Sequence, residues 1–388
     1  MRKCRPMKIV IAPDSFKESM SAKEAAAAIQ EGFSTILPST IEYDLIPMAD
    51  GGEGTTEALI DALNAKIITT TVKDPLYRDI NANYAYAPQQ KIAIIEMAAA
   101  SGLDLLSNEE RNPLKTTSFG TGQLINHALD QGAQKVILGI GGSATNDGGA
   151  GMLQALGVKF TDTNGHSIEP GGIHLLDIQT IDTTQLNSKL KNIDMKVACD
   201  VTNPLLGDNG ATMIYGPQKG ATTKMIPKLD TALSHYHDKI KLQLDKDVKD
   251  IPGAGAAGGM GTALLAFLDA QLSKGIDVVL EETHFKSRIK DADLVITGEG
   301  KLDYQTIFGK TPIGVAQVAK QFNLPVIAIG GSLGERYEAV YDHGIDSVLS
   351  IMNQPMDLQY ALDNGPTLLS QTAHNIARLL KLNMSFDS

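Results

Sequence analysis

The 388-residue sequence has very little cysteine and no long apolar run. Its two cysteines, Cys4 and Cys199, are too few for a disulfide framework or a thiolate metal site, which favours a reducing compartment. The longest apolar windows, such as Val136–Ile140, have the length of a strand, whereas a transmembrane helix needs roughly 20 apolar residues. The sequence therefore predicts a cytoplasmic protein without a membrane span.

The N-terminal residues do not predict a signal peptide. Its apolar run Ile9–Ala12 ends at Pro13 and is shorter than the core of roughly 7–15 residues that a signal peptide needs. We interpret residues 1–6 as an extension ahead of a start at Met7.

Basic residues are fewer than acidic ones, with 34 Lys and Arg against 45 Asp and Glu, and the formal net charge is −11. Such a charge repels nucleic acid and anionic membranes unless a basic patch overrides it, and the sequence contains none. With 43% hydrophobic and 20% charged residues, 37 Gly and only 16 Pro, disordered and collagen-like classes are excluded. At roughly 150 residues per domain, we expect two globular domains.

Strand-like apolar runs alternate with helices at both ends of the chain. Lys8–Ala12 and Ile41–Ile46 flank a helix whose start is marked by the capping box Ser21–Glu24. Three further runs lie near the C-terminus: Asp293–Thr297, Pro325–Ile329 and Ser347–Ile351. Five parallel strands with alternating helices predict a flavodoxin-like doubly wound sheet in the α/β class.

Two of these strands precede a gap of about 210 residues and three follow it. We therefore expect a discontinuous flavodoxin-like domain of residues 1–75 plus 286–388, with a second α/β domain inserted at residues 76–285. The insertion contains three further strand candidates, Ile92–Glu96, Lys135–Ile140 and Met195–Ala198, but their irregular spacing predicts no topology. Thr367–Leu382 has the pattern of an amphipathic closing helix.

Polar loops follow several of the expected strands. The segment Thr297–Asp303 begins at the carboxyl end of a strand, where open α/β sheets bind ligands. A simple turn needs its glycines but not Glu299, Lys301 and Asp303 together, and carboxylates placed there suit a hydrated Mg²⁺ that also binds phosphates. If the strand order is 2-1-3-4-5, Lys17 after the first strand shares the same crevice, and otherwise it is an ordinary solvated lysine.

Three other loops combine glycine with polar side chains. Ala49–Thr55 places three glycines beside Asp50 and Glu53, more than a helix-capping turn requires. Gly139–Gly149 has the density of glycine and short hydroxyls expected of a nest for phosphate or a polyol acid. Asp200 ends a strand ahead of Asn-Pro, so that it is either part of a plain turn or an outward-facing carboxylate.

Six segments closely resemble the bacterial glycerate kinase family, in its type I group with the glycerate 2-kinases of glucarate and glyoxylate metabolism. They are PDSFKESMSA at 13–22, MADGGEGT at 48–55, GIGGSATNDGGAG at 139–151, CDVTNPL at 199–205, PGAGAAGGMG at 252–261 and TGEGKLDYQT at 297–306. They occur in family order and span nearly the whole chain. The resemblance implies a phosphotransferase with an alcohol acceptor, which phosphorylates D-glycerate with ATP. It also implies a flavodoxin-like domain carrying an inserted α/β domain. Glu18 departs from the family, which commonly has glycine there, and puts the flexibility of that loop in doubt.

On this resemblance and the loop chemistry, each candidate residue receives an expected role. We expect Lys17 to neutralise the transferring phosphate, and Glu299 and Asp303 to hold Mg²⁺. Phosphate-binding candidates are Ser15, Gly141, Gly142, Gly298 and Gly300. Ser143, Thr145 and Asn146 are candidates for binding glycerate. Asp50, Asp147 or Asp200 would orient the attacking hydroxyl and take its proton.

Two alternatives stay open at this point. Transfer to the 2-hydroxyl, giving 2-phospho-D-glycerate, is the expected outcome, but the 3-hydroxyl lies only one carbon away and would give 3-phosphoglycerate. A non-catalytic, two-domain organic-acid-binding protein is the alternative from another class, and nucleotide binding would discriminate against it. We expect only small-molecule partners, and the sequence does not determine whether the chain forms a homo-oligomer.

Overall fold

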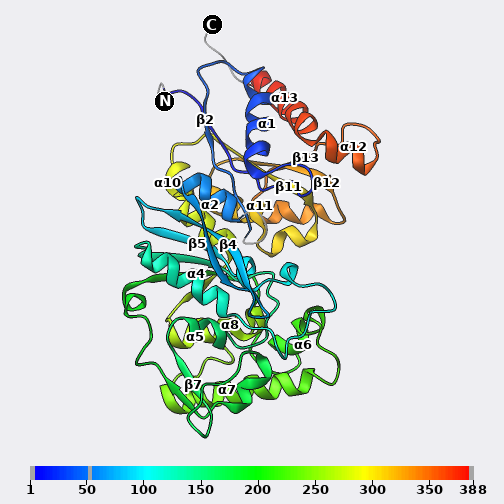
Figure 1. Ribbon diagram of the computed structural model, residues 1–388. Coiled ribbons are helices and arrows are strands. Elements are labelled where there is room, and N and C mark those ends of the chain that lie inside the picture. The colour runs from blue at the N-terminus through cyan, green and yellow to red at the C-terminus, as the bar shows by residue number, and fades with distance from the viewer. Residues whose placement is uncertain (1–4, 51–54, 384–388) are drawn as a thin grey trace. The chain divides into compact units, whose positions relative to one another are not determined.

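The structure, a computed structural model, describes residues 5–50 and 55–383. Cys4 and the segment 51–54, which includes Glu53, lie outside the described residues. The chain divides into two compact units, shown in Figure 1. The first unit consists of Met1–Leu63 with Lys274–Ser388, and the second of Asn64–Ser273.

The first unit is built on a five-stranded sheet in which every pair is parallel. Its strands are β1 (Lys8–Ile11), β2 (Glu42–Leu45), β11 (Leu294–Leu302), β12 (Val326–Leu333) and β13 (Ser347–Ser350). They lie in the order β13-β12-β11-β1-β2. If the five strands are numbered 1 to 5 along the chain and the sheet is followed from the β2 edge, the order is 2-1-3-4-5. This is the flavodoxin-like arrangement. The expected fold class is confirmed.

Helices cover this sheet. They are α1 (Ala22–Ser34), α2 (Thr55–Leu63), α9 (Gly275–Glu282), α10 (Phe285–Arg288), α11 (Thr311–Lys320), α12 (Leu358–Asp363) and α13 (Gly365–Asn383), with 3-10 helices η5 (Tyr304–Phe308) and η6 (Tyr337–His343). The capping box expected at Ser21 and Glu24 starts α1. In Figure 1, α1 and α13 lie side by side, and Gly32 allows their close approach because a Cβ there would lie 2.2 Å from the Ser370 carbonyl oxygen.

Strand β11 is longer than the sequence predicts. The apolar pattern ends at Thr297, and the following residues were expected to form a loop, but the strand continues to Leu302. Gly298 permits this, because a Cβ there would lie 2.3 Å from the Ile329 carbonyl oxygen of β12. Glu299 consequently lies on a paired strand, opposite Gly330, and its backbone is held rigidly.

The second unit contains a six-stranded mixed sheet in the order β10-β9-β6-β5-β4-β3 and a separate β7-β8 pair. The strands are β3 (Lys66–Lys73), β4 (Asp79–Ala87), β5 (Ile92–Glu96), β6 (Lys135–Gly139), β7 (Lys159–Thr161), β8 (Thr180–Asp182), β9 (Asp194–Ala198) and β10 (Gln271–Ser273). Strands β5, β6, β9 and β10 run parallel, whereas β3 and β4 are antiparallel additions at one edge. The carboxyl ends of β6 and β9 therefore lie next to each other.

Helices and short 3-10 turns connect these strands. They are α3 (Ala98–Ser101), α4 (Phe119–Asp130), α5 (Ala150–Ala155), α6 (Ala211–Tyr215), α7 (Ile226–Leu244) and α8 (Ala256–Phe267), with η1 (Leu103–Leu105), η2 (Gly172–Asp177), η3 (Ser188–Asn192) and η4 (Pro217–Lys219). Between α7 and α8 no strand is present in the described residues, so the G-x-G-x-x-G pattern at Gly253–Gly258 lacks the strand that a dinucleotide-binding turn requires.

The boundaries between the units differ from those expected at residues 75 and 285. Strand β3 pairs with β4 along its whole length, which places it in the second unit. Helix α9 contacts α2 and α11, which places it in the first unit. Both boundaries, after residues 63 and 273, therefore lie 12 residues earlier than expected (75 − 63 and 285 − 273). Apolar runs mark strands but do not show which sheet a strand joins.

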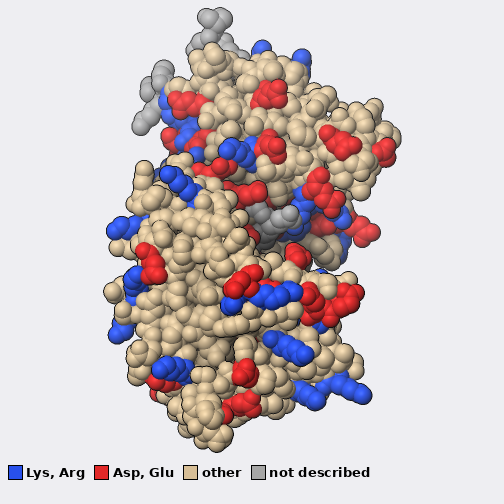
Figure 2. Space-filling model, viewed as in Figure 1, with Lys and Arg blue, Asp and Glu red and all other residues tan. Residues whose placement is uncertain are grey.

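Charged side chains of both signs are spread over the surface. On the face shown in Figure 2, the described Lys and Arg side chains are dispersed among Asp and Glu and form no continuous basic patch. Within residues 5–50 and 55–383, none of the helices combines the length and apolar character that crossing a membrane requires.

The backbone at Glu18 generates a stability prediction. Glu18 has φ 63°, a left-handed conformation that costs a residue other than glycine roughly 1–2 kcal/mol. Replacing Glu18 with Gly should therefore raise the free energy of unfolding by about 0.5–1 kcal/mol, after the greater chain entropy of glycine is subtracted. Urea denaturation measures the change. The control is Glu31→Gly on the exposed face of α1, which should lower stability by a similar amount; a loss of stability in both variants would contradict the prediction.

Candidate active site

The first candidate site lies where β1 and β11 are neighbours in the first unit. The chain continues from β1 to β2 on one side and later adds β11 on the other side, so the strand order reverses between β1 and β11. The Asp14 N–H donates to the Gly298 carbonyl oxygen at 2.8 Å. A Cβ on Gly300 would lie 3.5 Å from the Lys17 backbone nitrogen. The expected convergence of the Lys17 turn with the Glu299 segment is thus present.

Asp14 is a buried carboxylate at this point that the sequence analysis did not select. Its Oδ2 accepts a hydrogen bond from the Thr311 hydroxyl, and its Oδ1 accepts one from the Ser15 N–H, both at 2.6 Å. Burial raises the pKa of Asp14 to about 6, the Thr311 hydrogen bond opposes that rise, and the charge of Asp50 adds to it. The available signal was its position directly after Pro13, at the end of the first strand.

Glu299 lies in the same environment. Its Oε1 accepts a hydrogen bond from the Thr306 hydroxyl at 2.7 Å, and the Lys310 Nζ lies 3.5 Å from its Oε2. Burial raises the pKa of Glu299 to about 7; Thr306 and Lys310 oppose the rise, and the charges of Asp14 and Asp50 add to it. The burial effect therefore outweighs the ion pair. Asp14, Asp50 and Glu299 are close enough to influence one another, and we call these three residues the acidic cluster.

Asp303 is buried next to this cluster but also has a structural role. Its Oδ1 accepts from the Gln305 N–H at 2.9 Å and so caps η5. Lys301 Nζ lies 3.4 Å from its Oδ2. The Thr306 hydroxyl oxygen, 3.2 Å from the Asp303 N–H, connects Asp303 to Glu299. The two expected metal ligands are thus linked through one threonine.

The two polar side chains after β1 differ in exposure. Lys17 is exposed in a tight turn closed by the Ser19 N–H donating to the Phe16 carbonyl oxygen, and none of the described carboxylates forms an ion pair with it. Ser15 is half-buried, and its N–H is occupied by Asp14. Lys17 is therefore the more accessible group for an external phosphate.

The second candidate site is the loop after β6 in the second unit. Gly141 and Gly142 are exposed, and no described atom lies within 4 Å of a Cβ built on Gly141. The next polar residues, Ser143, Thr145 and Asn146, are buried. The Asn146 side-chain amide donates to the Thr212 hydroxyl at 3.0 Å. The Thr145 hydroxyl and the Asn146 side-chain oxygen are buried without a hydrogen-bond partner among the described residues.

The Gly253–Gly258 segment packs directly against this loop. Gly258 has φ 67°, and a Cβ there would lie 2.0 Å from the Thr145 carbonyl oxygen. Its carbonyl oxygen accepts from the Gly148 N–H at 3.0 Å. The small residues are therefore required for close packing. Close packing explains why this segment is rich in glycine, and no bound nucleotide is needed to explain it.

Asp147 is buried and holds the loop together. Its oxygens accept hydrogen bonds from the backbone N–H and the hydroxyl of Ser118, and from the backbone N–H groups of Gly149 and Gly151, at 2.8–3.3 Å. Burial raises its pKa, and these four donors oppose the rise. Ser118 and Gly149 precede α4 and α5, so Asp147 ties two helix starts together. This geometry favours a positioning role over that of a proton acceptor.

Lys219, at the end of η4, is a buried residue of this site that the sequence analysis missed. Its Nζ donates to the Ser143 hydroxyl oxygen and to the Thr145 carbonyl oxygen, both at 2.7 Å. It lies in a Gly-Pro-Gln-Lys-Gly turn with no apolar periodicity, and nothing local indicates that a lysine there is buried.

Asp200, by contrast, is exposed and follows β9, whose carboxyl end is adjacent to that of β6.

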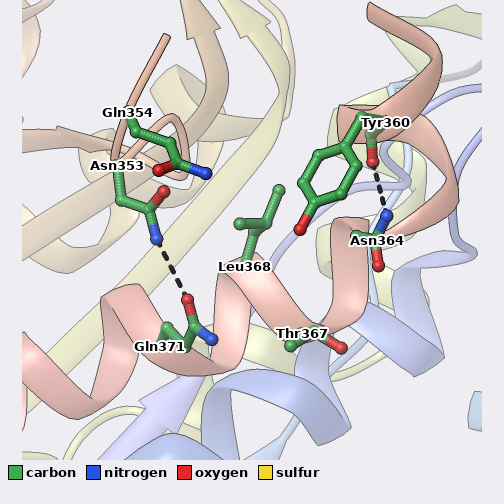
Figure 3. A pocket seen from close by; sticks show the side chains of 7 residues that line it. All are labelled: Asn353, Gln354, Tyr360, Asn364, Thr367, Leu368 and Gln371. Carbon is green, nitrogen blue, oxygen red and sulfur yellow. Dashed lines mark hydrogen bonds between the residues drawn. The ribbon is translucent and has the colours of Figure 1, made fainter. Parts of the chain in front are cut away.

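A separate pocket of about 410 Å³ lies where the chain leaves β13 (Figure 3). It is lined by Asn353, Gln354, Tyr360, Asn364, Thr367, Leu368 and Gln371. Among the lining residues, the Asn353 amide donates to the Gln371 side-chain oxygen at 3.0 Å (Figure 3). None of these seven residues is charged, so the pocket offers no ionic group to a phosphate or a carboxylate.

Known proteins resemble this chain over nearly its whole length. Residues 9–381 match the model of the glycerate kinase family. A glycerate kinase of Halalkalibacterium halodurans is 53% identical, with 97% of this chain and 99% of that protein covered. A glycerate 2-kinase of Escherichia coli is also 53% identical, with 97% and 99% covered. A crystal structure described as a glycerate kinase 2 from Salmonella typhimurium has a TM-score of 0.90 and 51% identity, covering 98% of this chain and 100% of that one.

These matches include all six segments on which the expected resemblance was based. The chain therefore belongs to the glycerate kinase family, and the enzyme class expected from its sequence, a phosphotransferase with an alcohol acceptor, is confirmed.

Proposed function

We propose that the protein transfers the γ-phosphoryl group of ATP to the 2-hydroxyl of D-glycerate, giving 2-phospho-D-glycerate and ADP. The observation that carries this proposal is the convergence of an exposed lysine, Lys17, with the buried carboxylates Asp14 and Glu299 at the strand-order reversal. Phosphoryl transfer needs such groups, because its catalysis consists mainly of positioning and charge neutralisation. The similarity to a glycerate 2-kinase of Escherichia coli supports the choice of hydroxyl.

The acidic cluster fits a divalent cation. Its donors are carboxylate oxygens, and Asp14 and Glu299 have raised pKa values because burial disfavours their charge and Asp50 adds repulsion. Within the described parts of the chain, no group of three or more His, Cys, Asp and Glu side chains is arranged to hold a metal alone. Mg²⁺ is commonly bound by one or two carboxylates together with substrate phosphates, and the carboxylates of this cluster are of that kind.

In this proposal Glu299 and Asp303 hold Mg²⁺ directly or through water. When bound, Mg²⁺ neutralises charge on the phosphate oxygens. Lys17, which is exposed in the turn after β1, stabilises the transferring phosphoryl group. In the first unit, the proposed phosphate contacts are the side chain of Ser15 and the backbone amides of Gly298 and Gly300. In the second unit, the backbone amides of Gly141 and Gly142 are separate candidates for binding phosphate.

The loop after β6 is the proposed glycerate site. Ser143, Thr145 and Asn146 offer hydroxyl and amide groups, two of whose atoms have no partner within the described structure. For the proton acceptor we retain Asp50, which is half-buried, and Asp200, which is exposed. Asp147 is retained as the residue that holds the loop, because four donors already occupy its carboxylate.

Two alternatives remain to be distinguished by experiment. Transfer to the 3-hydroxyl requires the same charged groups. It differs only in the orientation of D-glycerate, which would present its 3-hydroxyl to the phosphoryl group. A non-catalytic protein that binds organic acids would need the Ser143 loop but has no use for Lys17 beside Asp14 and Glu299.

The product identifies the acceptor hydroxyl. With D-glycerate, ATP and Mg²⁺, ADP release should depend on D-glycerate, and phosphorus NMR should show phosphate on the 2-hydroxyl. Phosphate on the 3-hydroxyl would keep the enzyme class but overturn the regiochemistry. Neither turnover nor ATP binding would favour the acid-binding protein.

Lys17 is tested by substitution. Lys17→Ala should lower kcat by 10²-fold or more, the loss of roughly 10²–10³ seen when one donor to developing charge is removed. The control is Lys23→Ala in the same unit, where a solvent-exposed lysine pairs with Asp61. An unchanged kcat in Lys17→Ala would remove this residue from the mechanism.

The buried carboxylate Glu299 should reduce stability at high pH in metal-free protein. Its folded pKa of about 7 exceeds the ordinary value of 4.5, so the folded state holds the proton more tightly and wild-type stability falls as the pH rises from about 4.5 to about 7. At pH 8, Glu299→Gln should therefore be more stable than wild type by about 1–3 kcal/mol. At pH 4.5 this advantage should disappear.

Urea denaturation with a chelator at both pH values measures this difference. Glu31→Gln, on the exposed face of α1, is the matched control and should change stability little at either pH. An equal effect of Glu299→Gln at pH 4.5 and pH 8 would show that packing, not the buried charge, determines the result.

A further inference from the structure

Lys219 is a buried cation in the second unit. Only 1% of it is exposed, although lysine is rarely buried without a partner of opposite charge. None of the described carboxylates forms an ion pair with it, and its two hydrogen bonds go to neutral oxygens of Ser143 and Thr145. Burying a charge is costly, and the nearby charge of Asp147 offsets that cost only in part. The cost indicates that an anion completes this site.

The surrounding backbone holds Lys219 in place. Gly220 follows it with φ 90°, and a Cβ at Gly220 would lie 2.2 Å from the Arg111 carbonyl oxygen. The turn is thus packed against the loop before α4 and leaves the lysine little freedom to move outward.

Two unpartnered polar atoms lie on the loop that Lys219 contacts. The Thr145 hydroxyl and the Asn146 side-chain oxygen are both fully buried and have no hydrogen-bond partner within the described structure. Buried polar atoms are normally hydrogen-bonded, so these two atoms favour a polar ligand at this loop. This observation is independent of the charge on Lys219.

The lysine determines which way the Ser143 hydroxyl can donate. Because the Lys219 ammonium donates to the Ser143 oxygen, the hydroxyl hydrogen of Ser143 must point to another acceptor. Ser143 is 6% exposed and follows the exposed glycines Gly141 and Gly142, so that this hydrogen can be directed toward a ligand over the loop. The adjacent cation strengthens the hydroxyl as a donor.

We propose that Lys219 is the positioning residue that makes this loop select an acid, by orienting the Ser143 hydroxyl toward the carboxylate of a small hydroxy acid. The inference rests on the proposed function for the identity of that acid, D-glycerate. Lys219 acts through Ser143 and through its charge, without touching the reacting phosphoryl group. It should therefore affect the KM for the acid more than kcat or the KM for ATP.

The protonation of Lys219 provides a second signature. Burial lowers its pKa to about 7, and the negative charge of Asp147 opposes that shift. The lysine loses its charge as the pH rises through about 7, and a bound carboxylate favours the protonated form. Binding of D-glycerate near pH 7.5 should thus be accompanied by proton uptake, measurable by calorimetry in buffers of different ionisation enthalpy.

Lys219→Met should raise the KM for D-glycerate by about 10–100-fold, the loss expected for a hydrogen bond involving a charged group, while the KM for ATP changes less than twofold. Proton uptake on binding D-glycerate should also be lost. Ser143→Ala should give a similar rise in KM without removing the buried charge, and the double variant should be no worse than the poorer single variant. Lys189→Met is the control, since Lys189 is half-exposed and pairs with Asp130 on the surface.

The outcomes separate this inference from the proposed function. If wild type phosphorylates D-glycerate but Lys219→Met keeps the wild-type KM and proton uptake, only the role of Lys219 is wrong. If wild type has no turnover with D-glycerate, the proposed function fails, and calorimetry with D-glycerate then decides whether Lys219 recognises the acid. Should Lys219→Met not fold, Ser143→Ala together with wild-type proton uptake decides: unchanged KM or absent uptake overturns the inference.

Discussion

The parallel pairing of β1 with β11 is the constraint on which the first candidate site depends. The two strands lie about 280 residues apart in the sequence, yet three consecutive residues of each are in register. Beyond the paired residues, the Asp14 N–H continues the contact by donating to the Gly298 carbonyl oxygen. Carboxyl ends of parallel strands lie at one edge of a sheet, so this pairing brings the Lys17 turn next to Glu299. Without it, the charged residues would belong to unrelated loops.

Both candidate sites contain buried charge that the described chain neutralises only in part, and the signs are opposite. In the first unit, Asp14 and Glu299 have raised pKa values because burial and mutual repulsion disfavour their ionised forms. In the second unit, burial lowers the pKa of Lys219. Each arrangement costs folding free energy, and each is relieved by a ligand of complementary charge. A metal-bound nucleotide suits the first site and an organic acid suits the second.

The loop after β6 illustrates how a functional segment is held in a defined shape. Asp147 accepts four hydrogen bonds and connects the starts of α4 and α5. Gly258 allows a neighbouring backbone to pack directly beneath Thr145. The sequence indicated Asp147 only as a candidate proton acceptor, because its partners, Ser118 and two backbone amides, are not recognisable from spacing. Its structural importance became visible only once those donors were located.

The sequence by itself determined the family and predicted the flavodoxin-like fold, because apolar runs and strand-end motifs are local patterns with a known sheet geometry. It predicted the convergence of Lys17 with Glu299 only if the strand order was 2-1-3-4-5, and the structure supplied that order. It did not indicate that β11 continues through Glu299 or that β3 joins the second sheet, since both depend on backbone pairing between distant segments. Nor did it reveal that Asp14 belongs to the acidic cluster, or that Lys219 donates a hydrogen bond to Ser143. Those residues acquire their chemistry from burial and from partners up to about 300 residues away, and only the tertiary structure decides which polar side chains are removed from water.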